Sequence, residues 1–138
     1  MTANRIVFLC QYGGAKSVIA TSYFNRLAAE HALPYEAVAA AADEPYDAVP
    51  PPVVALLGRD GFDVAAFTPR QVQPEDVSTA ERVISIDCDS SSSGSSEFLG
   101  VPRERWDDVP KVSEDLEGSA AAIRKHVEAL TEELRGRR

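Results

Sequence analysis

Short apolar runs alternate with helical patterns of hydrophobic and polar positions along the chain. The apolar runs predict β-strands over residues 5–9, 35–41 and 82–86. Apolar positions recur every three or four residues over 17–31, 53–59 and 113–134, and this spacing predicts helices there. A polar helix is predicted over residues 74–79. Strands that alternate with helices are typical of a parallel sheet covered on both faces. The pattern therefore predicts an α/β fold.

The last helical pattern is the clearest one. Its apolar positions fall on one face, at Leu116, Ala120, Ile123, Val127, Leu130 and Leu134. The proline run 50–52 can start a helix but cannot continue one, which sets the beginning of the helix over 53–59. Residues 61–66 are expected to be a connection or a short strand, and the low-complexity segment SSSSGSS at 90–96 is expected to be a loop.

Composition limits the architecture and the partners. A chain of 138 residues with 44% hydrophobic content fits one domain, 1–138. No apolar run approaches the roughly 20 residues of a membrane span, and the first apolar segment is too short for a secretory signal, so a cytoplasmic protein is expected. The net charge of −8, without a basic stripe, argues against binding to nucleic acid.

The segment IVFLCQYGGAKS carries the candidate chemistry. Cys10 directly follows the first predicted strand, and residues 11–16 form the turn into the first helix. Gly13 and Gly14 let several backbone N–H groups turn inward, and the helix N-terminus adds partial positive charge at the same point. Together with Lys16, this arrangement would bind an oxyanion and favour a Cys10 thiolate. Alternatively, Cys10 is a small buried hydrophobe before an ordinary tight turn, but the order of all these features favours the chemistry.

The same segment, followed by a helix, resembles the low-molecular-weight protein tyrosine phosphatase superfamily, which includes arsenate reductases. Its signature is a cysteine, five residues, an arginine, and a serine or threonine. The resemblance extends over AADEPYDAVPPPVVALLGRDGFDVAAFTPRQV and RVISIDCD. The segment GVPRERWDDVP resembles the tryptophan-containing segment of the reductases better than the aromatic acid loop of the phosphatases. The resemblance implies a single-domain three-layer fold with a central four-stranded parallel sheet, Cys10 as the nucleophile, and phosphate, arsenate or a phosphorylated molecule or protein as the partner.

The resemblance also assigns site residues by position. The oxyanion-binding loop corresponds to Gln11, Tyr12, Gly13, Gly14 and Ala15. Ser17 would donate a hydrogen bond to the Cys10 thiolate and could also cap the first helical turn. Two loop positions depart from the family. Lys16 replaces the signature arginine, so a compact ammonium group replaces a planar guanidinium group. Gly13 stands where the family usually has an asparagine whose side chain braces the loop.

The resemblance also concerns the general acid and the electron donor, which lie outside the loop. The family acid lies beyond the tryptophan in an Asp-Pro step, but this chain departs from the family and reads Trp106-Asp107-Asp108-Val109-Pro110. Asp108 is the candidate here, with Asp107 as the next choice; both are otherwise solvated loop carboxylates. Cys88 is a possible resolving thiol or a packed thiol at a strand end. A relay of three thiols is impossible with two cysteines, so reductase chemistry would use Cys88 or a small thiol reductant.

The remaining candidates have structural explanations. His31 and His126 lie on separate helices without a third ligand, so no metal site and no cofactor are expected. Trp106 is predicted to be a packing anchor. The function predicted is therefore a thiolate-based phosphatase or arsenate reductase. The alternatives are a non-catalytic oxyanion- or partner-binding module, and a sugar-transport IIB-like phosphocarrier, which fits the middle segments poorly.

Overall fold

A parallel sheet of four strands forms the centre of the molecule. The computed structural model describes residues 4–10, 15–41, 46–86, 103–106, 108–112 and 114–136. The strands are β1 (Asn4–Cys10), β2 (Tyr35–Ala41), β3 (Arg82–Ile86) and β4 (Arg103–Trp106). They are arranged in the order β2-β1-β3-β4, with every neighbouring pair parallel. The predicted α/β fold and its four-stranded parallel sheet are confirmed.

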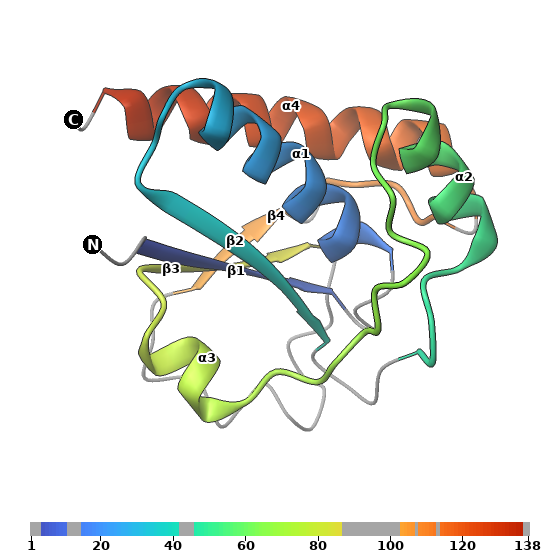
Figure 1. Cartoon of the computed structure of the whole chain (residues 1–138), viewed down its shortest axis with the longest axis horizontal. Coiled ribbons are helices and arrows are strands. Elements are labelled where there is room, and N and C mark those ends of the chain that lie inside the picture. Colours follow the sequence, from blue (N-terminus) through green and yellow to red (C-terminus); the bar gives the residue numbers. More distant parts are fainter. Residues whose placement is uncertain are drawn as a thin grey trace.

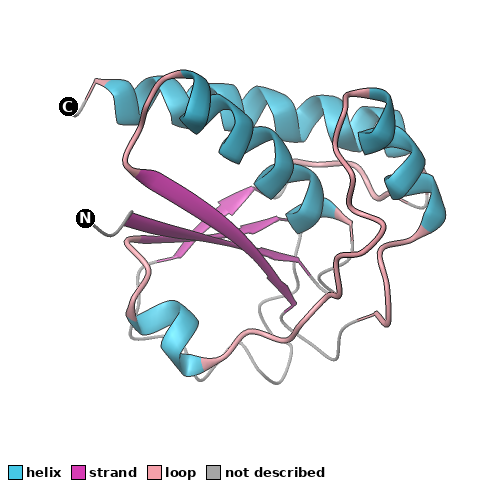
Figure 2. Ribbon diagram, in the orientation of Figure 1, coloured by secondary structure: helices cyan, strands magenta, loops and turns pink. Residues whose placement is uncertain are grey.

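Helices cover both faces of this sheet, as Figure 1 shows. Helices α1 (Lys16–Glu30), α2 (Pro51–Arg59) and α4 (Leu116–Arg135) lie on one face, and the short α3 (Pro74–Ser78) lies on the other. The three layers are also visible in the colouring by secondary structure (Figure 2). The segment 61–66 has no regular structure, so it is a connection, and the serine-rich segment 90–96 lies outside the described residues.

Three helices begin at residues other than the predicted ones, and α1 begins one residue early, at Lys16. Helix α2 starts at Pro51, because proline has no N–H to lose in the first turn of a helix. Helix α4 starts at Leu116 rather than at 113, because Asp115 occupies the N-cap and its side chain accepts a hydrogen bond from the Gly118 N–H at 2.9 Å.

Strand β4 was not predicted as a strand. Its sequence RERW is short and mostly charged, which hides the period of two that marks a longer strand. Its place at the edge of the sheet leaves room for the charges, because Glu104 forms an ion pair with Arg82 of β3 at 2.6 Å. Tertiary pairing, and not local preference, makes this segment a strand.

The side chains of β1 alternate between two apolar clusters. Ile6 and Phe8 pack in the larger cluster under α1, α2 and α4, whereas Val7 and Leu9 pack in the smaller cluster on the opposite face. Burial on both faces explains the continuous apolar run of a central parallel strand. Because β1 is so enclosed, its last residue, Cys10, has a well-defined position in the fold.

Candidate active site

Cys10 is the last residue of the central strand β1, at the carboxyl end of the strand and close to the start of α1 (Figure 1). Its side chain is buried, with 5% of the residue exposed, and its Sγ lies 3.1 Å from the Ser17 Oγ. When Cys10 is a thiolate, the Ser17 hydroxyl is the donor in this contact, because a thiolate carries no proton. The structure therefore brings the predicted nucleophile and its predicted hydrogen-bond donor together.

Ser17 is the second residue of α1 and is completely buried. Ala15 occupies the N-cap of this helix and makes no side-chain capping hydrogen bond. A buried hydroxyl without a partner would be costly. The contact with Cys10 accounts for a serine at this position.

The N-terminus of α1 is electropositive. Its first turn contains no acidic residue, and it begins at Lys16, whose side chain is partly buried. The first N–H groups of any α-helix have no partner within the helix and carry a partial positive charge. Cys10 thus lies beside a helix end that favours negative charge.

Part of the predicted site lies outside the described residues. These positions are Gln11, Tyr12, Gly13, Gly14, Asp107 and Cys88. The assignments of these loop residues, of the second acid candidate and of the possible resolving thiol therefore remain predictions. The described part of the site contains Cys10, Ala15, Lys16 and Ser17 at one end of β1, and Asp108 beyond β4.

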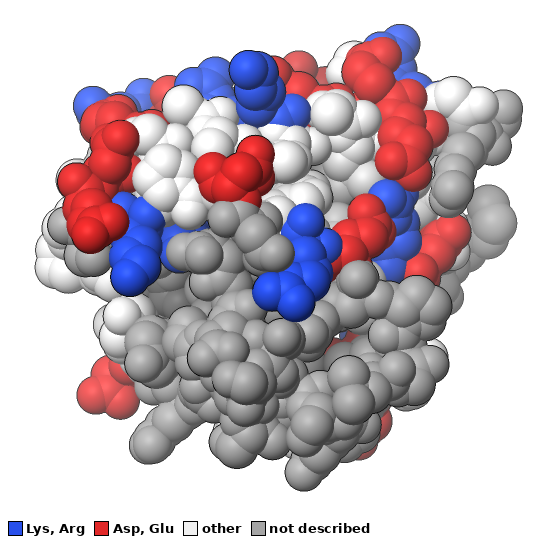
Figure 3. Space-filling model, turned by 180° about the vertical axis from the view of Figure 1, so that it is seen from behind, with Lys and Arg blue, Asp and Glu red and all other residues white. Residues whose placement is uncertain are grey.

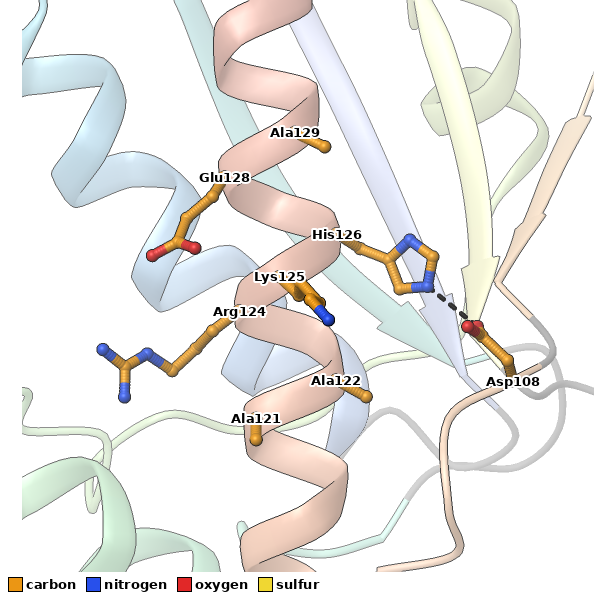
Figure 4. Close-up of a pocket in the computed structure, with 8 residues that line it drawn as sticks. All are labelled: Asp108, Ala121, Ala122, Arg124, Lys125, His126, Glu128 and Ala129. Carbon is orange, nitrogen blue, oxygen red and sulfur yellow. Dashed lines mark hydrogen bonds and ion pairs between the residues drawn. The ribbon is translucent and has the colours of Figure 1, made fainter.

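Asp108 makes a contact that the sequence did not indicate. Its Oδ1 lies 2.8 Å from Nε2 of His126 on α4, as the dashed line in Figure 4 shows. The hydrogen bond with His126 lowers the pKa of Asp108 below its usual value, although 73% of the side chain is exposed. Asp108 is therefore ionised at neutral pH in the absence of a bound anion.

His126 is fixed by an aromatic neighbour. Its ring stacks on the Trp106 indole with centroids 4.7 Å apart and an interplanar angle of 13°. Trp106 in turn contacts Phe8 of β1 at a centroid distance of 5.5 Å and is buried, as expected of a packing anchor. A continuous series of ring contacts thus connects the strand of Cys10 with the partner of Asp108.

A metal centre is not evident in the described part of the chain. Within it, no group of three or more His, Cys, Asp or Glu side chains could hold a metal ion. His31 lies at the C-cap of α1, and His126 belongs to the contacts just described. No described helix is both long enough and apolar enough to cross a membrane.

Charge is mixed on the face of the molecule opposite to the view of Figure 1. Among the described residues, Lys and Arg side chains alternate with Asp and Glu side chains on this face (Figure 3). Among the ion pairs of the described residues, Arg82 of β3 is paired with Glu104 of β4 and with Glu133 of α4, at 2.6 and 2.7 Å. These ion pairs connect neighbouring elements and do not form a basic stripe.

The chain is an α/β domain with a parallel sheet and a buried cysteine, Cys10, at the junction of β1 and α1. The family model of the low molecular weight phosphotyrosine protein phosphatases matches residues 5–135, and the chain belongs to this family. The resemblance noted in the sequence is thereby confirmed. The model describes phosphotyrosine protein phosphatases, and solved structures with the same fold include arsenate reductases.

Solved structures with the same fold include both kinds of protein. A low molecular weight protein tyrosine phosphatase from T. tengcongensis has a TM-score of 0.74 at 19% identity, with 95% of this chain and 99% of that chain covered. An arsenate reductase from Archaeoglobus fulgidus has a TM-score of 0.64 at 23% identity, with 95% and 98% covered. No curated protein sequence matches significantly.

A longer relative has the same fold. A thioredoxin-dependent arsenate reductase from Corynebacterium glutamicum has a TM-score of 0.75 at 17% identity, with 99% of this chain covered. The chain spans 64% of the length of that protein. At these identities the similarity to the solved structures concerns the fold alone.

Proposed function

We propose that this chain is a single-domain phosphomonoesterase in which the Cys10 thiolate attacks an oxyanion held at the N-terminus of α1. The observation that carries the proposal is the 3.1 Å contact between the Cys10 Sγ and the buried Ser17 hydroxyl, at the end of a parallel strand. Anionic ligands of open α/β folds bind at this edge, where helix N-termini converge. Family membership supports the same assignment.

The proposed reaction has two steps. In the first, the Cys10 Sγ forms a bond to phosphorus, the P–O ester bond breaks, and the leaving alkoxide takes a proton from Asp108. In the second, water attacks phosphorus and gives its proton to Asp108, so that phosphate leaves and the thiolate is restored. The amides of residues 11–15 and the Lys16 ammonium would stabilise the equatorial oxygens.

Asp108 needs a proton for the first step, although His126 favours its ionised form. A phosphate dianion bound near Asp108 would counteract this, because a nearby negative charge raises the pKa of a carboxyl group. The acid would therefore be formed in the complex with the substrate. Asp107 is the other candidate for the role.

A second candidate function is the reduction of arsenate. The sequence of residues 100–110, GVPRERWDDVP, resembles the tryptophan-containing segment of the reductases better than the acid loop of the phosphatases, which favours this version. Cys10 would form a bond to arsenic and release water, and a second thiolate, from Cys88 or a small thiol, would then attack the Cys10 sulfur. That attack forms a disulfide and leaves the electron pair on arsenic, which departs as arsenite. A third possibility is an oxyanion-binding module without turnover, in which Lys16 marks the loss of catalysis.

A matched assay separates these functions. Wild type, Cys10→Ser and Cys88→Ser are tested with p-nitrophenyl phosphate, and with arsenate plus either thioredoxin or glutathione. We expect phosphate release that is at least about a thousandfold slower in Cys10→Ser and unchanged in Cys88→Ser. Arsenite formation that requires Cys10 would assign the reductase instead. Phosphate binding without either reaction would leave only the binding module.

A further inference from the structure

We infer that His126 is a positioning residue that holds Asp108 in the orientation needed for proton transfer. The inference rests on the proposed function, in which Asp108 is the general acid. It concerns the 2.8 Å contact between the His126 Nε2 and the Asp108 Oδ1, two side chains that are 18 residues apart in the sequence. The contact joins α4 to the segment that follows β4 (Figure 4).

The His126 ring has little freedom. The Trp106 indole lies parallel to it, and Trp106 is itself buried against Phe8. Only 31% of the His126 side chain is exposed. Since an imidazole donates and accepts in the plane of its ring, the stack also fixes the direction of the hydrogen bond.

Asp108, in contrast, is free to adopt several orientations without this partner. Its side chain is 73% exposed and follows a strand, in a segment without regular structure. In the contact that Figure 4 shows, one carboxylate oxygen is engaged by His126. The inference requires the other oxygen to carry the proton that the leaving group receives. The arrangement corresponds to a positioned acid with one orienting hydrogen bond.

An exposed ion pair alone would not support this inference. Such pairs between flexible side chains contribute little, because ordering both side chains offsets the attraction. Here one partner is already ordered by an aromatic stack, so the entropy lost on forming the contact is smaller. Arg124, Lys125 and Glu128 of α4 line the same pocket, which makes Lys125 a suitable control for general electrostatic effects.

Substitutions of His126 can separate the hydrogen bond from the stack. His126→Phe keeps an aromatic ring against Trp106 and removes the donor, whereas His126→Gln places an amide N–H where Nε2 was. Lys125→Ala changes a neighbouring charge and leaves the contact intact. Urea unfolding of all three variants shows whether any effect on activity reflects a loss of stability.

The deciding measurement compares two substrates. Phenyl phosphate has a poor leaving group that needs a proton, whereas p-nitrophenyl phosphate has a good one that needs it much less. We expect His126→Phe to lower kcat for phenyl phosphate about tenfold and for p-nitrophenyl phosphate less than threefold. His126→Gln should recover part of the loss, and Lys125→Ala should change neither rate. His126→Phe should have no further effect in an Asp108→Asn background.

The outcomes distinguish the inference from the proposed function. Equal losses with both substrates, or a full additional loss in Asp108→Asn, would overturn the positioning role and leave the phosphatase assignment intact. Absence of turnover in the wild type would overturn the proposed function itself. Nitrogen NMR of wild-type His126 adds a readout that needs no substrate: a proton on Nε2 supports the contact, and its absence together with an ionised Asp108 contradicts it.

Discussion

Helices α1 and α4 pack beside each other, but their N-termini are built differently. In α4, the Asp115 side chain caps the first turn, Glu117 adds an acidic charge, and the buried Ser119 hydroxyl donates to the Pro110 carbonyl. In α1, the described residues supply no side-chain cap and no acidic charge in the first turn. The buried serine of α1, Ser17, contacts the Cys10 sulfur instead of a backbone carbonyl.

The difference separates a helix end that stabilises the fold from one that remains available for chemistry. Carboxylates in the first turn of α4 compensate its partial positive charge within the chain. The same charge at α1 acts on Cys10 and on any anion bound beside it. Natural proteins commonly accept a locally less favourable arrangement where function requires it. The absence of acidic residues from the first turn of α1 is therefore consistent with an anion site.

Among substitutions at the two helix ends, the largest effect is expected for Lys16 at the start of α1. Lys16→Ala should weaken phosphate binding roughly 10- to 100-fold, the range of a hydrogen bond to a charged group. Lys16→Arg should raise turnover of an aryl phosphate, because a guanidinium holds two oxygens of a tetrahedral anion. Isothermal titration with phosphate and steady-state kinetics measure both, and Lys125→Ala on α4 is the control. Unchanged phosphate affinity in Lys16→Ala would mean that the ammonium serves another contact.

A smaller effect is expected from the two buried serines. Ser17→Ala removes the donor to Cys10 and should slow alkylation of Cys10 at neutral pH about five- to tenfold. Ser119→Ala should leave this rate unchanged, although it also removes a buried hydroxyl. The rates of reaction with iodoacetamide are measured as a function of pH in a Cys88→Ser background. Equal rates in both serine variants would contradict the proposed contribution of Ser17 to the thiolate.

The smallest effect is expected at the cap of α4. Asp115→Ala should lower the free energy of unfolding by about 1 kcal/mol, because the Gly118 N–H loses its acceptor. Phosphate affinity and turnover should stay within about twofold of the wild type, since this helix end is not part of the site. Urea denaturation and the phosphate titration are sufficient to test this. A large loss of phosphate affinity with little loss of stability would abolish the distinction between the two helix ends.

Most of the fold could be predicted from local patterns. Helix α4 was visible in the spacing of its apolar residues, and β1 in its continuous apolar run. The contact between Cys10 and Ser17 was implied by the resemblance to the family, and both residues belong to one strand–turn–helix motif. In such a motif, the backbone itself determines which side chains can meet.

The unpredicted features depend on contacts between distant segments. Strand β4 exists because β3 pairs with it, and nothing in the sequence RERW indicates a strand. The pairing of His126 with Asp108 depends on the rotation of α4 and on the stacking with Trp106. A lone histidine on a helix carries no sign of such a partner, so the sequence indicated only that His126 has no further metal ligands near it.

The central position of β1 also determines how the molecule opens. This strand pairs with β2 along its whole length and with β3 on its other side, whereas the described partner of the four-residue β4 is β3 alone. The β1 amide hydrogens can therefore exchange with solvent only when the sheet opens. The free energy of this opening approaches the free energy of global unfolding. The edge strand can separate in a local fluctuation of lower free energy. The amide hydrogens of β4 are therefore expected to exchange with solvent before those of the strand that ends at Cys10.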